Sequence, residues 1–380
     1  MELATEDALR LNVLLANPLQ ALRIDESQMA VSALSERGEA TIRLNPTGRH
    51  DQYIRKVKEL ISSQVLGSPG GYPVYLKRWT RMGQARDDSL EQLLMLGEPE
   101  AVVAAVHAPG LTHELARRAW WALPESDNAR RMLERECVVA GQMGRVLAEF
   151  LLEYLPFETE PQAMMESMRL ILRPGLISED ARHKLWVKAR HKNTYYVGFL
   201  RAIPDDLPEE AAPHPEYPGH ADTLADLAAQ GNLVAAQLRR VLQGPGQAFL
   251  RTAEGVMRKP NNQDVVLGLL QALQEYFAPV HPCLPNHDHM PVIIEQVRRL
   301  CSAETVGERG CREDVRALLD ACPELHTSVE AMQVLACLSD RVVTPVFAHT
   351  DAIGTVMRRK LEPVTQPILE QFARLQGKAG

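Results

Sequence analysis

The sequence lacks the features that would mark a membrane or secreted protein. Its 380 residues include no apolar run of about 18 residues, so we expect no membrane span. The first residues, Met1 to Asp7, are acidic and lack the basic start of a signal peptide, so we expect no secretory leader. The six cysteines are widely spaced and form no CxxC pair, which indicates reduced thiols and a cytoplasmic location.

Recognisable catalytic motifs are also missing. The sequence has no GxSxG, no HExxH and no cysteine with a known catalytic flank. The glycine-rich loop Gly67–Gly71 follows a predicted helix and leads into a predicted strand, which reverses the order found in phosphate-binding loops. We therefore expect a protein that is not an enzyme and that needs no cofactor.

The composition favours helices and gives little support to nucleic-acid binding. Aromatic residues make up only 5% of the chain, whereas the helix-forming residues Leu, Ala, Glu and Arg are common. The net charge is −7, which argues against a dedicated nucleic-acid binder but leaves room for a local basic patch.

One stretch of the sequence occurs twice. Each copy opens with Glu-Pro-x-Ala, continues to Pro-Gly-Leu and reaches a tryptophan, from Glu98 to Trp121 and from Glu160 to Trp186. Helical units that recur in this way bury their apolar faces by stacking on one another. We expect two superposable helical units, in which the two tryptophans pack in equivalent places rather than bind a ligand.

The beginning of the chain reads differently from the rest. Helices are predicted at 5–15 and 51–66, with alternating apolar and polar residues between them at 21–44. Glu36–Glu39 predicts a hairpin turn, in which Gly38 supplies the positive φ. A further strand is predicted at 74–76, so this part is a small α+β module with an antiparallel sheet.

These patterns predict a mainly α protein in several parts. The α+β module covers residues 1–86, and stacked helical hairpins of an α-solenoid resembling HEAT repeats cover residues 87–202. Five prolines among acidic residues predict an extended linker at 203–220, before a C-terminal helical domain at 221–380.

Two basic clusters are candidates for partner binding. They lie at 49–58 and 77–86, with tyrosine and tryptophan interleaved, a combination that can bind RNA or an acidic partner. A solvated face on an acidic protein explains the same residues more simply. The residues singled out are Arg55, Lys58, Lys77 and Arg81.

A short histidine- and cysteine-containing segment is the candidate metal site. His281, Cys283, His287 and His289 place four potential zinc ligands within nine residues. Their spacing matches no standard zinc motif, and the two prolines, Pro282 and Pro285, are enough to explain a structured loop. We expect no metal, and therefore no cofactor, in this segment.

Several segments resemble the DsrS family, proteins encoded with the reverse dissimilatory sulfite reductase system of sulfur-oxidising bacteria. The segments that carry the resemblance are Leu9–Ala16, Gln20–Glu26, Arg43–Arg49, Val65–Pro73, Arg78–Gly83, Arg118–Pro124 and Asn128–Glu134. The resemblance implies a soluble cytoplasmic protein that supports oxidation of stored sulfur by regulating production of the reductase system after transcription. It supplies a pathway and no site residues.

Two functional interpretations follow. The preferred one is a non-catalytic accessory or regulatory protein, whose helical stack binds a protein partner of the sulfur-oxidation system or, with weaker support, RNA. The alternative is a thiol or metal protein that handles sulfur directly, as a persulfide carrier or the partner of a sulfurtransferase. In that case Cys283 or another cysteine carries the persulfide, and the histidine cluster tunes it.

Overall fold

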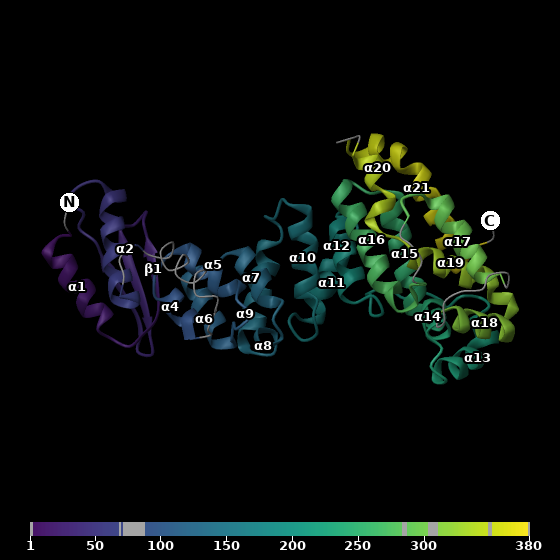
Figure 1. Cartoon of the computed structure of the whole chain (residues 1–380), viewed down its shortest axis with the longest axis horizontal. Helices are drawn as coiled ribbons and strands as arrows, with labels where there is room; N and C mark the ends of the chain where they lie inside the picture. The colour runs from purple at the N-terminus through teal and green to yellow at the C-terminus, as the bar shows by residue number, and fades with distance from the viewer. Residues whose placement is uncertain are drawn as a thin grey trace. The chain divides into compact units, whose positions relative to one another are not determined.

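The computed structural model shows a mainly α protein with a small antiparallel sheet near its N-terminus (Figure 1). It describes residues 3–67, 70, 88–282, 287–302, 311–348 and 352–378. The chain divides into two compact units, Met1–Tyr154 and Leu155–Gly380. Among the described residues, no helix combines the length and the apolar character that crossing a membrane requires.

The sheet of the first unit forms where the alternating pattern predicts it. Its strands are β1 (Leu19–Asp25), β2 (Ala30–Ser35) and β3 (Gly38–Arg43), antiparallel and in the order β1-β2-β3. Ser35 pairs with Gly38, whose φ of 113° closes the two-residue turn. The predicted hairpin is therefore confirmed. The strand expected at 74–76 lies outside the described residues.

Two helices cover this sheet, α1 (Thr5–Leu15) and α2 (His50–Leu66). Their buried faces share one core with the strands, including Leu11, Leu22, Val31 and Val57. This core also contains a polar contact, in which the Tyr53 hydroxyl donates to the buried carboxylate of Asp7 at 2.6 Å. The Asn45 N–H donates to the same carboxylate at 2.7 Å, so the buried acid is satisfied.

The rest of the first unit is helical in its described part. Ile24 of β1 donates its N–H to the Gly97 carbonyl at 3.2 Å, which joins the sheet edge to the loop before the next helix. The helices are α4 (Asp88–Leu94), α5 (Pro99–His107), α6 (His113–Ala122), α7 (Ser126–Leu133), α8 (Glu136–Val139) and α9 (Gln142–Tyr154).

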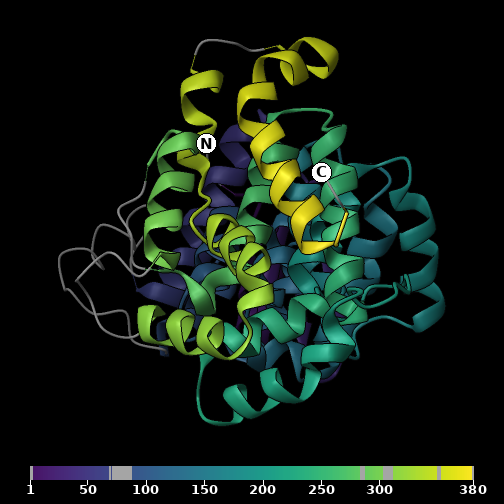
Figure 2. The same ribbon diagram turned by 90° about the vertical axis from the view of Figure 1, so that its right-hand side faces the viewer.

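The described part of the second unit is mainly helical, and its helices from α12 onward share a large apolar core. The longest, α21, packs along α15 and α19 and leads to the C-terminus, as Figure 2 shows in yellow. The α-helices are α10 (Pro161–Ile171), α11 (Glu179–Ala189), α12 (Asn193–Ala202), α13 (Tyr217–Ala229), α14 (Leu233–Leu242), α15 (Gly244–Arg258), α16 (Gln263–Phe277), α17 (Met290–Cys301), α18 (Cys311–Ala321), α19 (His326–Ala336), α20 (Thr344–Phe347) and α21 (Gly354–Leu375). Three short 3-10 helices lie between them at Ala278–Val280, Pro323–Leu325 and Asp340–Val342.

The two copies of the repeated stretch form similar local structures. Each opens a helix with a proline in the first turn, Pro99 in α5 and Pro161 in α10, where the missing N–H costs nothing. In each copy this helix packs against the third one along the chain, α7 or α12. However, α10 has 11 residues and α5 has 9, so the interval between matching positions is not constant. Whether the two copies superpose as units stays a prediction.

The second helix of each copy repeats the same ion pair. Arg117 pairs with Glu114 at 2.7 Å in α6, and Arg182 pairs with Glu179 at 3.4 Å in α11. Hydrogen bonds from Arg117, and next from Arg118, lower the pKa of the Glu114 carboxyl to about 2.

The two tryptophans have different surroundings. Trp186 is only 5% exposed and meets the ring edges of Tyr196 and Phe199, each at 4.9 Å between centroids. Trp121 is half-buried, and the Arg23 guanidinium lies 5.0 Å from its ring centroid. Both tryptophans therefore make packing contacts, but only Trp186 is a core residue.

Candidate functional site

The acidic, proline-rich segment between α12 and α13 is the starting point of the candidate site. Residues 203–216, which we call the strap, contain neither helix nor strand, as expected of an extended stretch. They are nevertheless packed on the second unit, because His214 is only 4% exposed and its N–H donates to the Leu242 carbonyl at 2.8 Å. The strap is thus part of the second unit's surface.

Arginines from three different helices hold the carboxylates of the strap. Three acids of the strap each pair with one guanidinium, and they lie in turns of the chain, where the Asp206 N–H donates to the Ile203 carbonyl and the Glu209 N–H to the Leu207 carbonyl. The pairs are Asp205 with Arg240 of α14 at 2.6 Å, Asp206 with Arg182 of α11 at 2.8 Å, and Glu209 with Arg251 of α15 at 3.5 Å.

The Arg240 pair combines two hydrogen bonds to Asp205 with a contact to an aromatic ring. Its Nε and Nη2 atoms donate to the two Asp205 oxygens at 2.8 and 2.6 Å, which is the bidentate geometry that suits a guanidinium. The same guanidinium lies 4.0 Å from the centroid of Tyr276, whose ring stacks on Phe249 at 3.9 Å. Burial raises the pKa of Tyr276, so its hydroxyl stays neutral at physiological pH.

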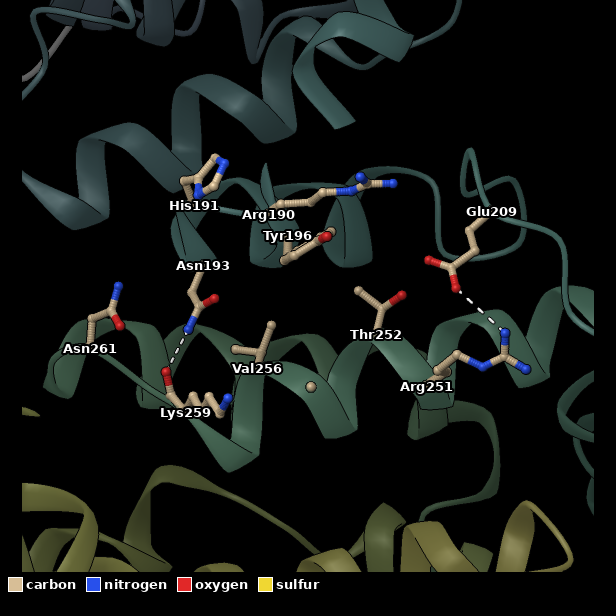
Figure 3. A pocket seen from close by; sticks show the side chains of 11 residues that line it. Arg190, His191, Asn193, Tyr196, Glu209, Arg251, Thr252, Val256, Lys259 and Asn261 are labelled. Carbon is tan, nitrogen blue, oxygen red and sulfur yellow. Dashed lines mark hydrogen bonds and ion pairs between the residues drawn. The ribbon is translucent and has the colours of Figure 1, made fainter. Parts of the chain in front are cut away.

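Beyond the last of these pairs, the surface opens into a groove of about 440 Å³ (Figure 3). One wall comes from the α11–α12 junction and the opposite wall from α15, while Glu209 of the strap lies at one end. The lining residues are Arg190, His191, Asn193, Tyr196, Glu209, Arg251, Thr252, Gly255, Val256, Lys259 and Asn261.

The two walls are fixed to each other. Asn193, the first residue of α12, donates a side-chain hydrogen bond to the Lys259 carbonyl at 2.7 Å. Lys259 is the C-cap of α15, so this bond also satisfies one of the carbonyls left open at a helix end. Packing against Trp186 holds the Tyr196 ring, which lines the groove from the same wall as Asn193.

The charge of the groove is positive, in a protein whose total charge is negative. Three cationic side chains line it, Arg190, Arg251 and Lys259, against one carboxylate, Glu209. Burial raises the pKa of Tyr196, with a further contribution from Glu209, so its hydroxyl remains a neutral hydrogen-bond donor. The groove can therefore bind anions through cations and neutral donors.

A glycine lies at the centre of the α15 wall. Gly255 is four residues from Arg251, so the two share one face of the helix, and Lys259, the C-cap four residues further on, lines the same groove. A Cβ placed on Gly255 would meet no atom within 4 Å, so no neighbouring side chain requires a glycine there. Its effect is to leave open space between the two cations.

The predicted metal ligands are only partly described. His281 is half-buried, His289 is exposed, and the His287 Nε2 lies 2.6 Å from the Gln296 side-chain nitrogen, while Cys283 lies outside the described residues. Within the described ranges, no group of three or more His, Cys, Asp or Glu side chains is close enough to hold a metal ion. The four-ligand arrangement stays untested, and the absence of a metal from this segment stays a prediction.

The predicted basic clusters are also only partly described. Arg55 is exposed on α2, whereas Lys58 pairs with Glu26 of the β1–β2 turn at 2.8 Å. Lys77 and Arg81 lie outside the described residues. Their convergence on one partner-binding face stays a prediction.

Two of the described cysteines, Cys322 and Cys337, do not have the setting of a sulfur carrier. Cys322 and Cys337 are buried, and burial, together with Glu324, raises the pKa of the Cys322 thiol. A carrier thiol needs the opposite shift. Cys137 is exposed, and its thiol donates to the Leu111 carbonyl at 3.3 Å.

The groove residues were missed at the sequence level. The basic run Lys188, Arg190, His191 and Lys192 was a visible signal, but it falls at a helix end in the middle of the repeat. Its partner residues in α15 lie about sixty residues further along the chain, and only the fold brings them together.

No family model, no curated protein and no solved structure matches this chain.

Proposed function

We propose that this protein is a non-catalytic, cytoplasmic accessory protein that supports oxidation of stored sulfur by binding a partner of the dissimilatory sulfite reductase system. The pathway comes from the resemblance to the DsrS family. The binding role comes from the helical architecture, because stacked helices offer broad, rigid surfaces for a partner. Control of reductase production after transcription is the form of regulation that the resemblance implies.

The observation that carries the binding role is the cationic groove beside the strap. Three arginines of the helical unit already bind carboxylates of a segment that is neither helix nor strand. The groove continues this basic surface with Arg190 and Lys259, whose charges face open space. Such a surface attracts acidic partners and discriminates against basic ones.

The test is capture of partners from extracts of a sulfur-oxidising bacterium, with the full-length protein immobilised. The wild type is compared with a variant in which Arg251 and Lys259 are both changed to Glu. The matched control changes Arg359 and Lys360, two exposed cations of α21, in the same way. A partner of the sulfur-oxidation system retained by the wild type and the control, but lost from the groove variant, is the expected result.

Bound material is identified by mass spectrometry for proteins and by sequencing for RNA. Equal capture by all three proteins would place the partner elsewhere on the molecule and contradict the groove as the binding surface. Groove-dependent capture of proteins from unrelated pathways would contradict the link to sulfur oxidation.

A further inference from the structure

We propose that the groove along α15 binds an extended acidic stretch of polypeptide, which meets Arg251 and Lys259 and displaces Glu209 from Arg251. This inference rests on the proposed function only in taking the groove as the partner-binding surface. It names the chemistry of the partner, namely a run of carboxylates on an extended chain.

The spacing of the cations favours an elongated ligand. Arg251 lies on α15 and Lys259 is the residue that caps the end of this helix, eight residues further on. The helical part of this stretch, from Arg251 to Arg258, rises about 10 Å at 1.5 Å per residue, so the two cations stand at well-separated places along the groove. The Arg251 guanidinium is turned toward Glu209, at the end of the groove. One compact anion such as phosphate does not bridge two charges placed in this way.

An extended peptide fits that span. At roughly 3.3 Å per residue, four residues of an extended chain cover about 13 Å, and side chains at i, i+2 and i+4 point to the same side. Carboxylates at i and i+4 therefore reach Arg251 and Lys259 together. Arg190, on the opposite wall, is placed to meet carboxylates on the other side of the peptide.

The strap shows that arginines of this helical unit bind carboxylates of a polypeptide segment, although the strap carries them in turns of the chain. Asp205, Asp206 and Glu209 lie on a chain without helix or strand, and each is held by an arginine of the helical unit. Glu209 makes the last of the three ion pairs along the strap, and it also lines one end of the groove. This intramolecular example is why a polypeptide, rather than a nucleic acid, is the ligand we infer.

The last pair of the strap is also the weakest. Arg251 and Glu209 are 3.5 Å apart, and their side chains are 55% and 37% exposed. Exposed pairs of this kind contribute little to stability. A partner carboxylate can therefore replace Glu209, while Asp205 and Asp206 keep the rest of the strap in place.

Gly255 supplies the space for the bound chain. In a helix, glycine is less favourable than alanine by about 1 kcal/mol, so an exposed glycine with no close neighbour weakens α15. Between two cations it leaves room for a peptide backbone close to the helix. A side chain at this position would fill the groove without disturbing the core.

The experiment measures binding of a fluorescein-labelled eight-residue peptide of alternating Glu and Ala, with both ends blocked, by fluorescence anisotropy. A peptide with Gln in place of Glu is the charge control. We expect binding of the Glu peptide that weakens as salt is raised, because exposed charges are screened. The Gln peptide should bind at least tenfold more weakly.

Three variants locate the site on the full-length protein. Lys259→Glu should weaken binding at least tenfold, and Glu209→Gln should tighten it about two- to fivefold by freeing Arg251. Gly255→Leu should weaken binding at least tenfold while its melting temperature stays equal to or above that of the wild type, since leucine favours a helix. Arg359→Glu, on exposed α21, should leave binding unchanged.

Several results would overturn the inference. Equal binding of the Glu and Gln peptides, or full binding by Gly255→Leu, would exclude an acidic peptide in this groove. Tighter groove-dependent binding of a single-stranded RNA of matched charge would replace the peptide by a nucleic acid. Groove-dependent capture of a cellular partner without binding of the Glu peptide would refute this inference alone, whereas peptide binding without any captured partner would refute the proposed function alone.

Discussion

Changing Arg240 to alanine is expected to loosen the strap and destabilise the second unit. Arg240 has two separate roles, because its guanidinium binds Asp205 and also lies over the ring of Tyr276. Alanine removes both. The strap would then lose its bidentate ion pair, and Glu209, which lies on the strap at one end of the groove, would be held less firmly.

The expected size of the effect follows from these two contacts. The Asp205 side chain is 49% exposed, so its pair contributes about 1 kcal/mol despite the bidentate geometry. Contact of the guanidinium with the largely buried Tyr276 ring contributes about 1–2 kcal/mol. We expect Arg240→Ala to lower the free energy of unfolding by about 2–3 kcal/mol in total.

Two further variants separate the contributions. Asp205→Asn removes only the ion pair, so it should cost about 1 kcal/mol and raise amide exchange in the strap about fivefold. Arg240→Lys keeps a charge near Asp205 but loses the planar contact with the ring. Its cost should fall between those of the other two.

The assay combines urea unfolding, followed by circular dichroism, with hydrogen exchange of residues 203–216. Arg240→Ala already removes the ion pair with Asp205, so adding Asp205→Asn removes no further contact. The single variant Arg240→Ala and the double variant should therefore have nearly the same free energy of unfolding. The reasoning would be refuted if Arg240→Ala left both stability and strap exchange unchanged. It would also be refuted if Asp205→Asn cost as much as Arg240→Ala.

Three other predictions concern stability and are measured by urea unfolding. Trp186→Ala should cost about 3–5 kcal/mol because the ring is buried, while Trp121→Ala should cost about 1–2 kcal/mol because the ring is half-buried; equal costs would contradict their different surroundings. Tyr53→Phe should cost about 1.5–3 kcal/mol because it removes a donor from the buried Asp7 carboxylate, and a change below about 0.5 kcal/mol would show that water replaces the hydroxyl. Glu114→Gln should cost at most about 1 kcal/mol at neutral pH, since this carboxyl is partly exposed. The pKa of the Glu114 carboxyl falls from 4.5 in the unfolded chain to about 2 in the folded protein. The difference in unfolding free energy between the wild type and Glu114→Gln should therefore be complete above pH 4.5 and vanish as the pH falls toward 2. A difference in stability that persists at pH 2 would refute the ion pair as its cause.

The sequence by itself determined the local structure. Gly38 and the alternation around it set the hairpin, because the turn needs a positive φ and the sheet needs a period of two. Pro99 and Pro161 marked two helix starts, and the structure begins α5 and α10 at these residues. These signals act between near neighbours in the chain, so they can be read without the fold.

The tertiary structure decided what the strap and the groove are. Proline and acidic residues predicted an extended linker at 203–220, whereas α13 already begins at Tyr217. Nothing in that stretch of sequence shows that Arg240 or Arg251 would bind its carboxylates. Lys259 reaches the same groove as Arg190 only because α15 packs near α12, which depends on apolar residues shared by the whole core. Ion pairs and grooves of this kind join residues far apart in sequence, and such contacts leave no periodic pattern in the chain.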